Sequence, residues 1–126
     1  MKSIIFSFIF GVISLFENQN NFPQNLEPTI SKEVISFESI VIEDNKIKLN
    51  WSSLYKEKTE MFVIQNSKDG KTFIDITMIV SSTNEPITSE YDFIDVFPNR
   101  GKNYYRLKVV DFDGQFEYSK TIITII

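Results

Sequence analysis

Short apolar runs separated by polar turn signals make up the chain from Val34 onward. The runs are rich in Ile, Val, Phe and Tyr, recur roughly every 10 to 15 residues and keep no helical period. Such spacing is typical of sandwiches and barrels built from antiparallel strands. The pattern predicts one all-β domain over residues 34–126, an immunoglobulin-like β-sandwich of about seven antiparallel strands.

The run Lys46–Trp51 shows the cleanest alternation of apolar and polar residues. Successive side chains of a strand point to opposite faces, so Ile47, Leu49 and Trp51 point one way while the polar residues between them point the other. One buried face and one hydrated face indicate an antiparallel sheet with Trp51 in the core.

The same alternation assigns inward positions on two later strands. Phe62 and Ile64 are expected to face the core, and so are Leu107 and Val109. The other strands are expected at Ser36–Ile42, Met61–Ser67, Phe73–Val80, Tyr91–Asp95, Asn103–Val110 and Phe116–Ile125.

Two segments depart from simple alternation. The apolar residues of Phe73–Val80 fall on both faces, which predicts a bulge or a buried edge in this strand. The stretch Ser81–Glu90 is polar and contains a proline, so it is predicted as a loop.

Two Asp-Gly sequences mark tight turns between strands. Gly70 is expected to supply a positive φ in the turn Lys68–Lys71, and Gly114 to do so in the later hairpin turn that begins at Asp111. Phe112 lies at the tip of this hairpin and is a candidate contact residue, although packing within the turn is the preferred interpretation.

The carboxylates of Asp111 and Asp113 also allow a calcium interpretation, because Ca²⁺ prefers clustered carboxylates. Compared with an EF-hand loop, Gly114 comes too early and the distal Glu is misplaced. A hairpin turn is therefore preferred, and no metal site is assigned; Asp111 and Asp113 remain weak candidates.

Cys and His are absent from the chain. Their absence excludes a disulfide framework, a Cys nucleophile and a His general base, and it disfavours a structural zinc site. Asp92 and Asp95 are three residues apart on a strand and so are expected on opposite faces; Asp95 is expected to cap backbone N–H groups of the following loop. No catalytic residue and no cofactor are therefore expected.

The formal net charge is −4, and no Lys/Arg cluster reverses it locally. Phosphate binding requires a basic surface, so nucleic acid is not an expected partner.

The N-terminus begins Met1-Lys2-Ser3 and then runs largely apolar from Ile4 to Phe16. A positive residue before a short apolar run is the layout of a secretory signal peptide, and a transmembrane helix needs about 20 apolar residues. Residues 1–16 are predicted as a signal peptide with an uncertain cleavage site, with a buried segment or an uncleaved anchor as alternatives. Residues 17–33 are rich in Pro and amides and are predicted as a flexible linker.

Trp51, Gly101 and the run Tyr105–Asp111 together resemble fibronectin type III domains. The resemblance implies a fibronectin type III β-sandwich. It also implies a tyrosine corner, in which Tyr105 opens a strand and its hydroxyl bonds back to the preceding turn.

A longer set of residues resembles one subgroup of that family. The set comprises Phe62-x-Ile64-x-x-Ser67-x-Asp69-Gly70-x-x-Phe73, Tyr91-x-Phe93-x-Asp95, Tyr104-Tyr105-Arg106-Leu107 and Asp111-x-Asp113-Gly114-x-Phe116-x-Tyr118-Ser119. These residues are similar to the fibronectin-like domain that precedes the C-terminal sorting domain in cargo of the bacterial type IX secretion system. The resemblance covers about Ile47 to Ile125. A sorting domain usually follows in that family, whereas this sequence stops at Ile126, so the type IX route is not inferred.

Together these features predict a non-catalytic, exported interaction or spacer module at the cell surface, in the periplasm or outside the cell. The sequence does not identify its partner, an unknown protein or a glycan. The mature domain is expected to have no membrane span and to be a monomer when isolated. Two alternatives stay open: a calcium-dependent binder or small enzyme that uses the loop carboxylates of Asp111 and Asp113, and a truncated tail fragment of a secreted multidomain protein.

Overall fold

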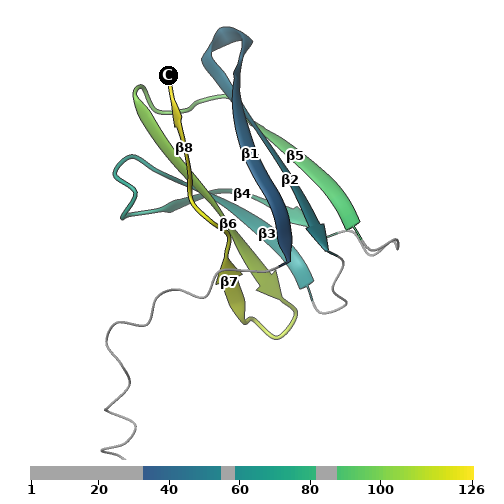
Figure 1. The fold of residues 1–126 in the computed structure, drawn as a ribbon. Coiled ribbons are helices and arrows are strands. Elements are labelled where there is room, and N and C mark those ends of the chain that lie inside the picture. The colour runs from purple at the N-terminus through teal and green to yellow at the C-terminus, as the bar shows by residue number, and fades with distance from the viewer. Residues whose placement is uncertain (1–32, 55–58, 82–87) are drawn as a thin grey trace, which may run out of the picture.

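The computed structural model describes residues 33–54, 59–81 and 88–126, which form two β-sheets packed face to face (Figure 1). The predicted signal peptide and all but the last residue of the predicted linker lie outside the described residues. The strands are β1 (Val34–Ile42), β2 (Lys46–Leu54), β3 (Thr59–Ser67), β4 (Ile74–Val80), β5 (Thr88–Asp95), β6 (Lys102–Asp111), β7 (Phe116–Tyr118) and β8 (Ile122–Ile125), with a short 3-10 helix, Glu43–Asn45, between β1 and β2.

One sheet has three strands in the order β1-β2-β5, and the other has five, with β4-β3-β6 in order and both β7 and β8 pairing with β6. All of these pairings are antiparallel. The predicted fold class, an immunoglobulin-like all-β sandwich, is therefore confirmed. Across the described residues, no helix reaches the length and apolar character that a membrane crossing requires.

The fifth strand is longer than the sequence pattern predicts. Residues 88–90, expected to lie in the loop Ser81–Glu90, belong to β5 and pair with β2 from Leu54 to Ser52. These residues are polar, so alternation alone gives no sign of a strand. Their place in the ladder follows from the neighbouring strand, which supplies the hydrogen-bond partners.

The last predicted strand, Phe116–Ile125, is divided into β7 and β8 at Ser119. The backbone N–H of Ser119 donates to the Leu107 carbonyl at 2.8 Å, and the Ser119 hydroxyl oxygen accepts from the Leu107 N–H at 2.8 Å. The side chain of Ser119 thus takes the position of a backbone carbonyl in the ladder. The edge of the sheet changes direction there without leaving Leu107 unpaired.

The mixed apolar pattern of β4 corresponds to an irregular register with β3. Ile64 pairs with Thr77 while Gln65 pairs with Asp75, so Ile76 is an extra residue on β4. An extra residue of this kind is a β-bulge, one of the two outcomes that the sequence pattern predicts for this strand.

The core lies between the sheets and centres on Trp51 of β2, which is 2% exposed. Its indole stacks on Tyr91 of β5 at 5.4 Å between ring centroids and meets Phe62 of the opposite sheet edge-on at 5.8 Å. Phe62 and Tyr91 also contact each other, at 4.9 Å. The other buried members of the core are Phe37, Ile47, Leu49, Ile64, Tyr105, Leu107 and Val109.

Trp51→Ala is expected to lower the free energy of unfolding by about 3–5 kcal/mol, because it opens a cavity between the sheets. Trp51→Phe is expected to cost about half as much. The Trp51 indole nitrogen is buried and has no hydrogen-bond partner among residues 33–54, 59–81 and 88–126, so the change removes packing area but no bond seen there. Urea denaturation measures both values. Equal midpoints for the alanine variant and the parent would show that Trp51 is not a core residue.

Candidate functional site

The turn between β3 and β4 is held by the side chains of Ser67 and Asp69. Asp69 Oδ1 accepts hydrogen bonds from the backbone N–H groups of Lys71 and Thr72 at 2.8 and 2.9 Å. Ser67 Oγ accepts from the N–H of Gly70 at 2.9 Å and donates to Asp69 Oδ1 at 2.9 Å. These bonds, above all that from Thr72, hold the pKa of Asp69 at about 2. The carboxylate of Asp69 is thus used to order the turn.

Two constraints favour glycine at position 70. Its φ is +74°, as the Asp-Gly turn predicts, and a Cβ on it would lie 3.0 Å from Cε1 of Tyr104. The ring of Tyr104 therefore covers the turn, and only a residue without a side chain fits beneath it.

Asp95 and Tyr105 meet at the end of the sandwich where β5 leads into β6. The Tyr105 hydroxyl donates to Asp95 Oδ2 at 2.7 Å, while Asp95 Oδ1 accepts from the Phe97 N–H at 3.1 Å. Burial and the Asp95 carboxylate raise the pKa of Tyr105 well above its usual value of 10. Asp95 caps the loop as the sequence predicts, and the Tyr105 hydroxyl bonds back to a side chain at the end of β5.

Asp92 and Asp95 lie on opposite faces of β5. Asp92 is on the outer face, where its Oδ2 is 3.7 Å from Nζ of Lys48. Asp95 reaches Tyr105, whose side chain is fully buried in the core. The two carboxylates therefore do not share a site, as their spacing predicts.

Three asparagines beside this corner form a network that the sequence does not single out. Asn99 donates through Nδ2 to Asn66 Oδ1 at 2.7 Å, and through its backbone N–H to Asn103 Oδ1 at 2.8 Å. Asn103 in turn donates to the Asn99 carbonyl at 2.7 Å. The only sequence signal is that Asn66 and Asn103 stand at inward positions of their strands, where apolar residues are usual.

The hairpin turn after β6 is built by the backbone and by Asp113. The Gly114 N–H donates to the Asp111 carbonyl at 2.9 Å, and Asp113 Oδ1 accepts from the Gln115 N–H at 3.1 Å. Gly114 has a φ of +85°. Phe112 is exposed at the tip. Within the described part of the chain, no group of three or more His, Cys, Asp or Glu side chains could hold a metal ion.

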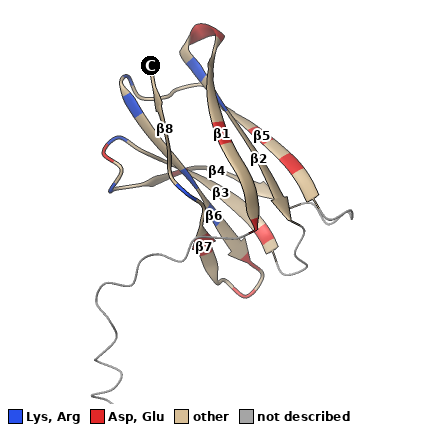
Figure 2. Ribbon diagram, viewed as in Figure 1, with Lys and Arg blue, Asp and Glu red and all other residues tan. Residues whose placement is uncertain are grey.

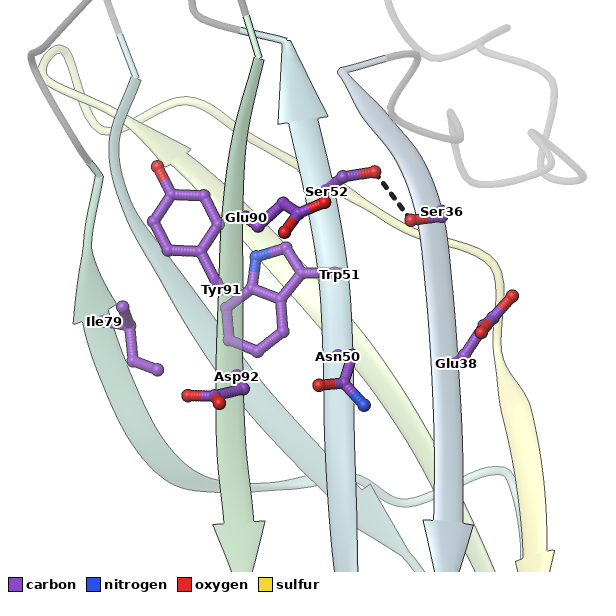
Figure 3. A pocket seen from close by; sticks show the side chains of 9 residues that line it. All are labelled: Ser36, Glu38, Asn50, Trp51, Ser52, Ile79, Glu90, Tyr91 and Asp92. Carbon is purple, nitrogen blue, oxygen red and sulfur yellow. Dashed lines mark hydrogen bonds between the residues drawn. The ribbon is translucent and has the colours of Figure 1, made fainter.

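The outer face of the three-stranded sheet carries polar side chains in two adjacent rows (Figure 3). Ser36 and Ser52 share a hydrogen bond of 2.6 Å between their hydroxyl oxygens. A hollow of about 610 Å³ is lined by side chains of both rows, Glu38, Asn50 and Asp92 among them, and also by Trp51, Tyr91 and Ile79, which pack in or against the core. The Trp51 indole nitrogen itself is buried.

An apolar surface covers part of the outer face of the five-stranded sheet. Met78, Val80 and Phe116 are 66%, 77% and 48% exposed. Register places Val80, Met61, Val110 and Phe116 in one row across four strands, with Met78 beside Val63 in the next row. We call this surface the outer apolar patch; its residues are Met61, Val63, Met78, Val80, Val110 and Phe116.

Cationic side chains lie over aromatic rings beside the outer apolar patch. The Arg106 guanidinium carbon is 3.8 Å from the ring centroids of both Phe73 and Tyr118, and Lys108 Nζ is 4.1 Å from that of Phe116. Arg106 Nε also donates to Gln65 Oε1 at 2.7 Å. These contacts fix the two cations on the sheet and cover part of the aromatic surface.

No family model, curated protein or solved structure matches the chain. The fold and the surfaces described above are therefore the basis for a functional proposal.

Asp69 is expected to make stability fall in acid. The pKa of Asp69 in the folded chain is about 2, below the ordinary 3.8. Its contribution to the free energy of unfolding is therefore fully present above pH 3.8 and is lost as the pH falls through 2. Asp69→Asn keeps an oxygen acceptor but cannot titrate, so its melting temperature should fall less over this range. Thermal melts at several pH values measure the effect, and identical acid profiles for parent and variant would contradict it.

The bond between Tyr105 and Asp95 is expected to stabilise the fold as a coupled pair. Tyr105→Phe should lower the free energy of unfolding by about 1.5–3 kcal/mol, since it removes a partly buried hydrogen bond to a carboxylate. A double-mutant cycle with Asp95→Ala should give a coupling energy of about 1 kcal/mol or more. Additive effects in urea denaturation would mean that the hydroxyl and the carboxylate act independently.

Proposed function

We propose that this chain is a non-catalytic, exported interaction module that binds a protein through the outer apolar patch. The observation that carries the proposal is the exposure of Met78, Val80 and Phe116 together on one face of one sheet. A contiguous exposed apolar surface on a soluble domain marks an interaction site more often than chance, and Met side chains adapt well to a partner surface.

The chemistry of the outer apolar patch favours a protein partner over a glycan. Glycan recognition needs hydrogen-bonding groups around an aromatic platform, but the rings of Phe73 and Tyr118 are already covered by Arg106. The polar face of the other sheet has hydrogen-bonding groups, yet its neighbouring rings, Trp51 and Tyr91, stack on each other in or against the core. An apolar partner surface fits the patch with the least loss of hydration.

Export and family membership belong to the same proposal and rest on the sequence. Lys2 followed by the apolar run Ile4–Phe16 supports a signal peptide. Trp51 on β2 and Tyr105 near the start of β6 support a fibronectin type III-like domain of the kind found in type IX secretion cargo. Such a domain would act as a spacer between other segments of an exported protein and would also carry a binding surface.

A photo-crosslinking residue at Val80 is expected to join the chain to a protein in cells that express it. The same residue at Ile40 is the matched control, because Ile40 is an apolar residue 56% exposed on the outer face of the other sheet. Met78→Glu, at a side chain outside the core, should reduce the Val80 product several-fold without a change in melting temperature. Mass spectrometry identifies the joined protein.

Equal crosslinking from Val80 and Ile40, or a Val80 product unaffected by Met78→Glu, would show that the patch is not a binding surface. Cell fractionation of the same strain tests export. Retention of the full chain inside the cell, with residues 1–16 uncleaved, would contradict the proposed compartment.

A further inference from the structure

The guanidinium of Arg106 is held in place on the outer face of the five-stranded sheet. Its central carbon lies 3.8 Å from the ring centroids of both Phe73, which precedes β4, and Tyr118 of β7. Its Nε donates to Gln65 Oε1 at 2.7 Å. The two rings and the amide come from three different segments, so the position of this cation is fixed before any partner binds.

The terminal nitrogens of this guanidinium carry hydrogen-bond donors that the described residues do not use. Among residues 33–54, 59–81 and 88–126, the hydrogen bond of the Arg106 side chain is the one from Nε, and neither ion pair includes Arg106. The N–H groups of both terminal nitrogens therefore remain for water or for a partner.

The carboxylate of Asp75 lies on the same face but does not pair with Arg106. Asp75 is opposite Gln65 in the register of β3 and β4, and its Oδ1 accepts from Gln65 Nε2 at 2.7 Å. The Asp75 carboxylate thus orients the guanidinium through Gln65 and leaves the terminal nitrogens unbonded. Glu117 of β7 is opposite the buried Val109, so its side chain points to the other face of the sheet.

A second cation, Lys108, lies on the same face of β6. In register it stands between Val63 and Tyr118, and its Nζ is 4.1 Å from the ring centroid of Phe116. It joins no ion pair within the described part of the chain. Figure 2 shows blue bands along β6, with red in the turn that follows it. The outer apolar patch therefore adjoins two positive charges.

We propose that Arg106 is the point at which this face recognises a carboxylate of its protein partner, an Asp or Glu side chain flanked by apolar residues. The flat guanidinium matches a carboxylate, because its two terminal nitrogens can donate to both carboxylate oxygens. The flanking apolar residues would pack on the outer apolar patch, where Met78 and Phe116 are exposed. The inference rests on the proposed function and deepens it by stating the chemistry of the partner.

The contacts around Arg106 make such recognition selective. A mobile arginine side chain loses conformational entropy when it binds, whereas this one is already held by two rings and by Gln65. A partner that covers the guanidinium removes water from its terminal nitrogens. A wholly apolar partner would leave these donors without an acceptor, so a partner with a carboxylate at this point is favoured over it.

Arg106→Lys keeps the positive charge but removes the flat pair of donors, so it is expected to reduce the Val80 crosslink several-fold. Arg100→Lys is the matched control and should leave the product unchanged, since Arg100 is the other arginine of the chain and is exposed in the loop before β6. Phe73→Leu removes one of the two rings and should also reduce the product, whereas Phe73→Tyr keeps the ring and should not.

Binding of the purified full chain to the protein that the crosslink identifies gives the size of the effect. Arg106→Lys is expected to raise the Kd about tenfold at low salt, by isothermal titration. The difference between parent and variant should persist at high salt, because the lost feature is the paired hydrogen bond and the charge is kept.

A measurement on the parent chain is independent of any effect of substitution on folding. Sodium acetate supplies a carboxylate alone, and it is expected to shift the Nε–H resonance of Arg106 saturably in the millimolar range. The resonance of Arg100 should show no saturable shift, and sodium chloride at equal ionic strength should leave that of Arg106 unchanged.

A Val80 crosslink that is lost in Met78→Glu but unchanged in Arg106→Lys overturns the inference and leaves the proposed function standing. An Arg106 resonance that acetate does not shift overturns it too, and so does an equal loss of product in Phe73→Leu and Phe73→Tyr. Absence of any patch-dependent crosslink overturns the proposed function itself.

Discussion

The aromatic contact between Trp51, Tyr91 and Phe62 is the interaction on which the rest of the structure depends. Trp51 and Tyr91 belong to one sheet and Phe62 to the other, so this contact fixes how the two sheets face each other. A sandwich without a disulfide must gain its stability from such burial, because no crosslink holds the two sheets together. Once the rings are packed, the alternation along β2, β3 and β6 decides which side chains lie inside and which lie on the two outer faces.

The two sheets differ in size, and the larger one carries the outer apolar patch. Three strands oppose five, and β4 lies at the edge of the larger sheet with a single neighbouring strand among the described residues. On the other flank, β7 and β8 share one partner strand, and Ser119 keeps that edge hydrogen-bonded. The larger sheet thus ends in β4 on one side and in β7 and β8 on the other, and each of these strands pairs with a single strand among the described residues. The proposed binding role uses the outer apolar patch, which crosses this sheet from β4 to β7.

Polar side chains inside or beside the core hold the loops in place through hydrogen bonds. Asp69 and Ser67 hold one turn, and Asp95 with the asparagines around Asn103 holds the connection from β5 to β6. Each of these groups hydrogen-bonds to nearby backbone, and several also bond to one another's side chains. In the same way Asp113, a weak calcium candidate in the sequence, accepts the Gln115 N–H of its own turn in the folded chain.

The sequence by itself determined the fold class, the inward positions and the turns. Period-two alternation places Ile47, Leu49 and Trp51 on one face whatever the partner strand is, and Asp-Gly requires a positive φ at Gly70 and Gly114. Tertiary structure alone decided the extension of β5 to Thr88, the break at Ser119 and the asparagine network. These features depend on hydrogen-bond partners many residues away, which leave no local pattern. The outer apolar patch likewise depends on tertiary structure, since Met78 and Phe116 come to lie on one sheet face only when β4, β3, β6 and β7 have paired.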